Sequence, residues 1–105
     1  MPAKTRRQVL EKMVADDPRD AFARYGLAMD YSGTGETDAA WRLFQDLMAH
    51  CPDYVPGYLQ AGQLLVRMGR DDDARMVFRT GIEAARNQND MHAAGEMQGF
   101  LDQIG

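Results

Sequence analysis

The chain has 105 residues, of which 45% are hydrophobic and 27% are charged, and its formal net charge is −4. A chain of this length and apolar content is expected to fold as one domain and is too apolar to remain disordered. Sixteen acidic residues against twelve basic ones leave no surplus of positive charge to hold a phosphate backbone. We therefore expect no nucleic-acid partner.

The sequence also bears on cell location. No apolar run approaches the roughly 18 residues that a membrane-spanning helix needs, and no apolar core of a signal peptide follows the first basic residues. The single cysteine, Cys51, cannot form an internal disulfide, so nothing points to an oxidising compartment. These features predict a cytoplasmic protein without a membrane partner.

A sequence repeat with a period of 34 residues organises the chain. Five identities occur at this spacing between 18–51 and 52–85: Pro18 and Pro52, Gly35 and Gly69, Asp38 and Asp72, Ala40 and Ala74, and Phe44 and Phe78. The segment 4–16 carries Val9, Leu10, Met13 and Val14 at the matching positions one period earlier. We therefore interpret it as an N-terminal half repeat, the second helix of a helix pair.

The first full repeat is predicted to span 18–51 and to contain two helices. Its first helix covers about 20–33, with Asp17 as the cap and Pro18 in the first turn, and the glycines of the segment 33–35 end it. Its second helix has one apolar face, formed by Ala40, Leu43, Phe44, Leu47, Met48 and Cys51. The spacing i, i+3, i+4, i+7, i+8 is that of an amphipathic helix.

The second repeat is predicted to span 52–86 with the same plan. A helix over about 54–68 has Pro56 in its first turn and ends at Gly69. The apolar face of the next helix is formed by Ala74, Val77, Phe78, Gly81, Ile82 and Ala85. No stretch alternates with a period of two, so no sheet is expected.

A last helix over 90–103, capped by Asp90 or Asn89, is expected to close the domain. Gly95 and Gly99 lie inside it, and each costs about 1 kcal/mol relative to alanine. Their four-residue spacing would let this helix lie close against its neighbour. We thus predict an all-α protein of about six helices.

These residues resemble the tetratricopeptide repeat (TPR), whose 34-residue pattern is W-x2-L-G-x2-Y, then A-x3-F, then P. The matching positions are Arg24, Leu27, Ala28, Tyr31, Ala40, Phe44 and Pro52 in the first repeat and Tyr58, Ala61, Gly62, Leu65, Ala74, Phe78 and Arg86 in the second. The tryptophan and the final proline are replaced by Arg24 and Arg86. The resemblance implies a single TPR-like domain over 1–105 with an α-solenoid of antiparallel helix pairs.

The resemblance also implies a function. Proteins of this family present a concave face, lined by the first helix of each repeat, to a peptide or helix of another protein. The corresponding positions predicted to bind a partner are Phe22, Tyr25, Met29, Leu59, Gln63, Val66 and Arg67. If the last helix acts as a third first helix, Ala93, Met97 and Phe100 would extend this strip.

Other functions are less well supported by the sequence. His50 and Cys51 are adjacent and so point about 100° apart on a helix, which disfavours a catalytic dyad, and two histidines with one cysteine make a poor zinc set. The segment 33–35 lacks the Lys-Ser/Thr of a phosphate-binding loop. We expect no enzyme activity and no cofactor. Self-assembly through repeat stacking, as a homo-oligomer, and an assembly or secretion chaperone remain alternatives to the interaction scaffold.

Overall fold

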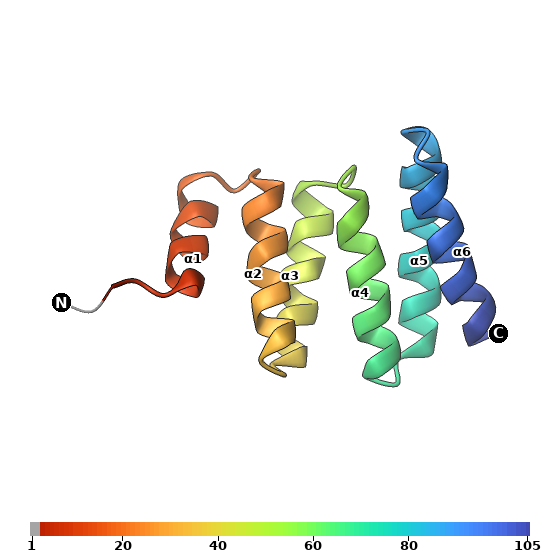
Figure 1. Cartoon of the computed structure of the whole chain (residues 1–105), viewed down its shortest axis with the longest axis horizontal. Helices are drawn as coiled ribbons and strands as arrows, with labels where there is room; N and C mark the ends of the chain where they lie inside the picture. The colour runs from red at the N-terminus through yellow and green to blue at the C-terminus, as the bar shows by residue number, and fades with distance from the viewer. Residues whose placement is uncertain (1–2) are drawn as a thin grey trace. The chain divides into compact units, whose positions relative to one another are not determined.

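The computed structural model describes residues 3–105 and consists of six α-helices joined by short turns (Figure 1). The helices are α1 (Arg6–Asp16), α2 (Ala21–Gly33), α3 (Thr37–His50), α4 (Val55–Arg67), α5 (Asp71–Asn87) and α6 (Met91–Ile104). The described residues contain no strand. The prediction of an all-α fold of about six helices is confirmed. The helices fall into two compact units, one ending at Cys51 and the other running from Pro52 to Gly105.

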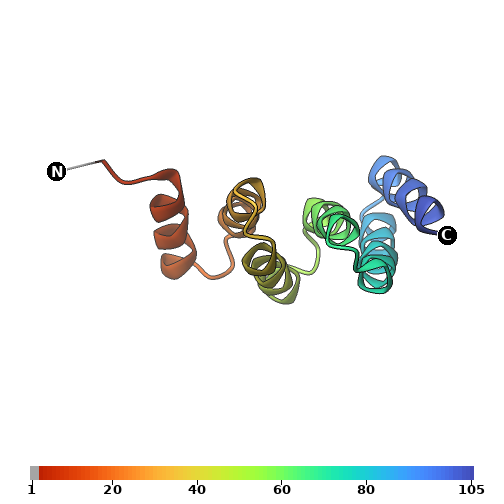
Figure 2. The ribbon, with the colours of Figure 1, turned by 90° about the horizontal axis from the view of Figure 1, so that it is seen from below.

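The first unit contains α1, α2 and α3, with α2 packed against both of its neighbours (Figure 2). Leu10 of α1 meets Ala23 and Leu27 of α2 in the core of this unit. A methyl group added at Gly26 would lie 3.2 Å from a methyl carbon of Leu10, so the absence of a side chain lets α1 approach α2. Of the apolar face predicted for 4–16, Leu10 is buried and Met13 and Val14 pack against this core. The prediction is wrong for Val9, which is 43% exposed, because α1 packs against α2 alone among the described helices.

The second unit contains α4, α5 and α6, and α5 packs against both other helices (Figures 1 and 2). Phe78 of α5 is fully buried, and its ring stacks on Phe100 of α6 with centroids 5.6 Å apart. On the α4 side, a methyl group at Gly62 would overlap the ring of Phe78. A single aromatic side chain therefore fills the space where the three helices meet.

Helix starts agree with the sequence analysis in part. Asp90 caps α6 by accepting a hydrogen bond from the Ala93 backbone N–H, and Pro56 lies in the first turn of α4, both as predicted. The predicted cap of α2 is wrong. Asp20, not Asp17, accepts from the Ala23 N–H, while Asp17 accepts from the Arg19 N–H in the preceding turn. A proline-containing turn separates α1 from α2, so α2 starts three residues later than the Asp-Pro pair suggested.

Three helices end in the same left-handed turn. Gly35 after α2 and Gly69 after α4 have φ of 81° and 74°, as their predicted role at helix ends requires. Asn89 after α5 takes the same place with φ of 58°. In each turn the N–H of the following residue bonds a carbonyl five residues back, which satisfies a terminal carbonyl of the helix.

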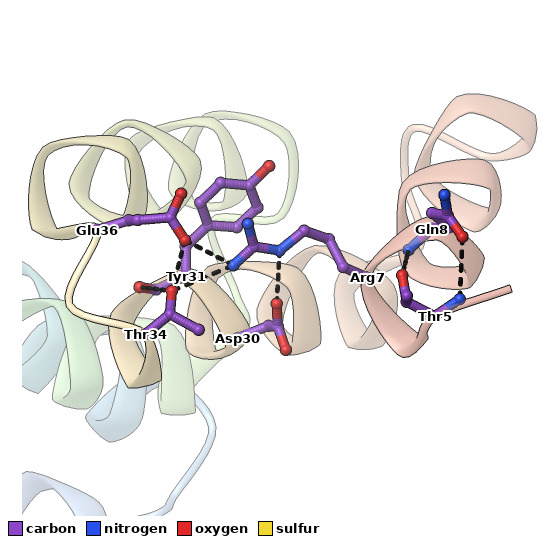
Figure 3. A network of polar contacts seen from close by, with 7 residues as sticks. All are labelled: Thr5, Arg7, Gln8, Asp30, Tyr31, Thr34 and Glu36. Carbon is purple, nitrogen blue, oxygen red and sulfur yellow. Dashed lines mark hydrogen bonds and ion pairs between the residues drawn. The ribbon is translucent and has the colours of Figure 1, made fainter.

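A polar network fastens α1 to the end of α2 (Figure 3). The Arg7 Nε donates to Asp30 at 2.7 Å, and its Nη2 donates to Glu36 at 2.8 Å and to the Thr34 hydroxyl at 3.2 Å. The guanidinium also lies over the Tyr31 ring, 3.7 Å from its centroid. The hydrogen bond to Glu36 and then that to Asp30 raise the pKa of Arg7, and the bond from Arg7 lowers the pKa of Glu36.

Replacing Arg7 with alanine is expected to raise the pKa of Glu36 toward the usual glutamate value. Because folding lowers this pKa, the network stabilises the native state above the usual glutamate pKa, and this contribution disappears as the pH falls through the lowered value. An NMR titration of the Glu36 carboxyl tests the shift. The matched control is Lys12→Ala, which removes an α1 cation that pairs with Asp16 instead. An unchanged Glu36 pKa in Arg7→Ala would contradict the assignment.

Candidate functional site

The predicted partner-binding residues of the first repeat lie on α2. Phe22 is 67% exposed, which is a large exposure for a phenylalanine, while Tyr25 and Met29 are half-buried. The spacing of i, i+3 and i+7 brings the three side chains onto one side of the helix. The α2 face, defined as Phe22, Tyr25 and Met29, is therefore an apolar stripe with an exposed aromatic ring at its N-terminal end.

The predicted residues of the second repeat lie on α4. Val66 is 40% exposed, Leu59 and Gln63 are half-buried, and Arg67 is exposed. The opposite side of α4 packs into the second unit through Tyr58, Ala61 and other buried residues. We define the α4 face as Leu59, Gln63, Val66 and Arg67. It thus combines two aliphatic side chains with two polar ones.

The helix α6 does not extend this strip with Met97 and Phe100 as expected. Met97 is fully buried, and its sulfur would lie 2.6 Å from a methyl group added at Gly81, while Phe100 stacks on Phe78. The helix α4 starts 34 residues after α2, but α6 starts 36 residues after α4. Two extra residues turn each side chain by about 200° around the helix axis.

The shifted register gives Gly95 and Gly99 a different place from the predicted one. Both are exposed, and a methyl group added at either would have no atom within 4 Å. They therefore do not bring α6 close to its neighbour. The close approaches of the second unit occur instead at Gly62 and Gly81, where an added methyl group would overlap neighbouring side chains.

The end of α3 carries His50 and Cys51, whose adjacency raised the question of a catalytic dyad. His50 Nδ1 lies 2.9 Å from the Asp46 carbonyl oxygen, whereas the Cys51 thiol points toward the Arg19 carbonyl oxygen at 3.6 Å. The two adjacent residues thus have separate partners. Within residues 3–105, no three His, Cys, Asp or Glu side chains are arranged to hold a metal ion. None of the six helices has the length and hydropathy needed to cross a membrane.

Tyr58 is a buried residue of the second unit whose pKa is shifted by the fold. The Tyr58 hydroxyl donates to the Pro52 carbonyl oxygen at 2.7 Å. Burial of the ring raises the pKa of Tyr58, and the charge of Asp53 adds to this effect. A neutral tyrosine with a satisfied hydroxyl is a structural anchor for the start of α4.

A feature that the sequence analysis missed is the outer side of α5. Met76 is 67% exposed, and Arg79 and Glu83 follow it at helical spacing. The amphipathic pattern drew attention to the buried face of this helix, and Met76 falls outside that pattern. Among the described residues Met97 is the buried methionine, and only the folded unit distinguishes it from the exposed Met76.

Comparison with known proteins places this arrangement in a family. No protein-family model matches the sequence. The TPR repeat-containing protein PA0015 of Pseudomonas aeruginosa is 30% identical over 95 residues, covering 90% of each chain. The chain belongs to the TPR repeat family. The predicted fold class, an α-solenoid of TPR helix pairs, is confirmed with it.

Solved structures support the same fold. A TPR domain protein from Salinibacter ruber aligns with a TM-score of 0.78 and 35% identity, over 84% of this TPR chain and 89% of that one. The translocator chaperone SycD of Yersinia enterocolitica aligns at 0.83 and 16% identity, over 93% of this chain and 68% of its own. PcrH, solved in complex with the chaperone binding region of PopD, aligns at 0.85 and 16% identity, over 93% and 74%. The last two likenesses concern the fold alone.

Proposed function

We propose that this TPR protein is a non-catalytic, cytoplasmic interaction module that binds a peptide or amphipathic helix of another protein through the α2 and α4 faces. The observation that carries the proposal is the exposed ring of Phe22, in line with the half-buried Tyr25 and Met29. An apolar stripe left in water on a small protein is a common mark of a binding surface.

The chemistry of the two faces indicates the kind of ligand. Apolar groups at i, i+3 and i+7 on α2 match the anchor spacing of an amphipathic helix or the pockets for an extended peptide. The net charge of −4 favours a ligand that is apolar and mildly basic. The fold is compatible with such a role, because PcrH is solved with a segment of PopD bound.

The test begins by identifying the partner with tagged protein in its native cell and then measuring affinity with the purified partner segment. Tyr25→Ala and Leu59→Ala are each expected to weaken binding by about 1–3 kcal/mol, as the loss of a buried interface anchor does. Phe22→Ala should fall in the same range. The matched control is Met91→Ala, which removes a side chain of similar exposure, 62%, from α6 outside both faces.

Circular dichroism separates binding from folding in these variants. Folded variants that bind the partner with the affinity of the wild type would place the contact surface elsewhere. Unfolding of both Tyr25→Ala and Leu59→Ala would assign these side chains to the core and would also overturn the proposal.

A further inference from the structure

A hollow of about 410 Å³ lies along α5 and α6 in the second unit. Ile82, which is 4% exposed, and the half-buried Leu101 provide its apolar lining. Arg79, Glu83 and Arg86 stand around it on α5. The hollow is separate from the α2 and α4 faces, with which it shares no residue.

The charged side chains around the hollow alternate in sign. Arg79, Glu83 and Arg86 follow one another at i, i+4 and i+7, so they lie on one side of α5. Among residues 3–105, none of these three side chains makes a hydrogen bond or an ion pair. This contrasts with Arg70 and Arg75 at the start of α5, which bond to Asp73 and Asp72. The three charges on this part of α5 are exposed and are therefore available to groups outside the chain.

The order of these side chains is self-complementary. If a second α5 is laid antiparallel across the first at the level of Gly81, Arg79 of each copy faces Glu83 of the other. The same operation brings Met76 of each copy opposite Arg86 of the other, so the aliphatic stem of the arginine covers an exposed methionine. A two-fold contact requires this relation, in which residue i meets residue j and j meets i.

We propose that the chain forms a two-fold symmetric homodimer in which the outer sides of two α5 helices pack antiparallel over this hollow. An acidic ligand fits the surface less well, because Glu83 stands between the two arginines and would repel it. A second copy satisfies both signs of charge and covers Met76. The dimer is independent of the proposed function, since partner binding uses other residues.

Variants that reverse the charge of Arg79 or Glu83 test the proposal. Their molar mass is measured by light scattering and sedimentation at protein concentrations from about 1 µM to about 1 mM. The wild type is expected to pass from monomer to dimer in this range. Arg79→Glu and Glu83→Arg each place like charges opposite one another twice, and each should raise the dissociation constant at least about tenfold. The double variant Arg79→Glu/Glu83→Arg restores both pairs and should return the dissociation constant to near that of the wild type.

Two substitutions of Met76 give a second test, because they are expected to change the dimer dissociation constant in opposite directions. Met76→Glu places a carboxylate opposite Arg86 and should tighten the dimer, whereas Met76→Lys should weaken it. The control is Arg42→Glu, an exposed site on α3 with the same change in net charge as Arg79→Glu, which should leave the dimer unchanged. A wild type that stays monomeric throughout overturns the proposal. The proposal is also overturned if neither single charge reversal changes the dissociation constant, or if the double variant does not restore it. Equal weakening of the dimer by Met76→Glu and Met76→Lys would overturn it as well.

Discussion

Replacing Phe78 with alanine is expected to lower the free energy of unfolding by about 3–5 kcal/mol, the largest effect of any substitution considered for this TPR protein. The side chain is fully buried where the three helices of the second unit meet. Its removal leaves a cavity beside Gly62, where no side chain can move in, and takes away the ring on which Phe100 stacks. Neighbouring groups can therefore fill only part of the space.

Urea unfolding followed by circular dichroism measures this loss, and Phe22→Ala is the matched control. It makes the same chemical change at a ring that is 67% exposed and should alter stability by no more than about 0.5 kcal/mol. Phe78→Leu leaves a smaller cavity, so its free energy of unfolding should fall less than that of Phe78→Ala. This variant can be compared with Phe22→Ala if Phe78→Ala does not fold. Similar losses for Phe22→Ala and Phe78→Ala would show that the core has been placed on the wrong face.

Adding a single methyl group at Gly62 or Gly81 is expected to destabilise the protein by about 1–2 kcal/mol. At Gly81 the methyl carbon would lie 2.5 Å from the Cβ of Tyr58, which is fixed to the backbone of α4, so the helices must separate. At Gly62 it would overlap the fully buried ring of Phe78. Overpacking costs about 1–3 kcal/mol, and the better helix propensity of alanine returns up to about 1 kcal/mol.

The same substitution at Gly95 or Gly99 is expected to have the opposite sign. Both sites are helical and open, so alanine should stabilise the protein by about 0.5–1 kcal/mol through backbone entropy alone. The four variants unfolded in urea under one set of conditions provide the measurement. Destabilisation at Gly95 and Gly99 would mean that these glycines do form a close helix contact.

The two proposed surfaces differ in how far they follow from the sequence. The α2 and α4 faces come from the repeat pattern, because position within a repeat specifies the side of the helix. The proposed α5 surface comes from the folded unit, because it depends on the exposure of Met76, Arg79 and Glu83. A substitution on one surface leaves the other intact, so the two hypotheses can be tested separately.

Local patterns along the chain were enough to predict the six helices, the glycine turns that end two of them and the resemblance to the TPR family. Apolar spacing of three and four residues and glycines at left-handed turns are local properties, so they predicted the buried faces of α3 and α5 and the turns at Gly35 and Gly69. The small residues Ala28, Ala40 and Ala74 are all fully buried, as their repeat positions require. These features depend on neighbouring residues along the chain, and a sequence contains that information directly.

The side of α6 that faces the core could not be predicted from the repeat and follows from packing in the folded unit. The helix α5 has 17 residues where α3 has 14, and the start of α6 shifts by two residues from the repeat period. In a helix that shift rotates every side chain by about 200°, which buries Met97 and exposes Gly95 and Gly99. The period of a repeat cannot specify this orientation, because it is set by the packing of Met97 and Phe100 against α5.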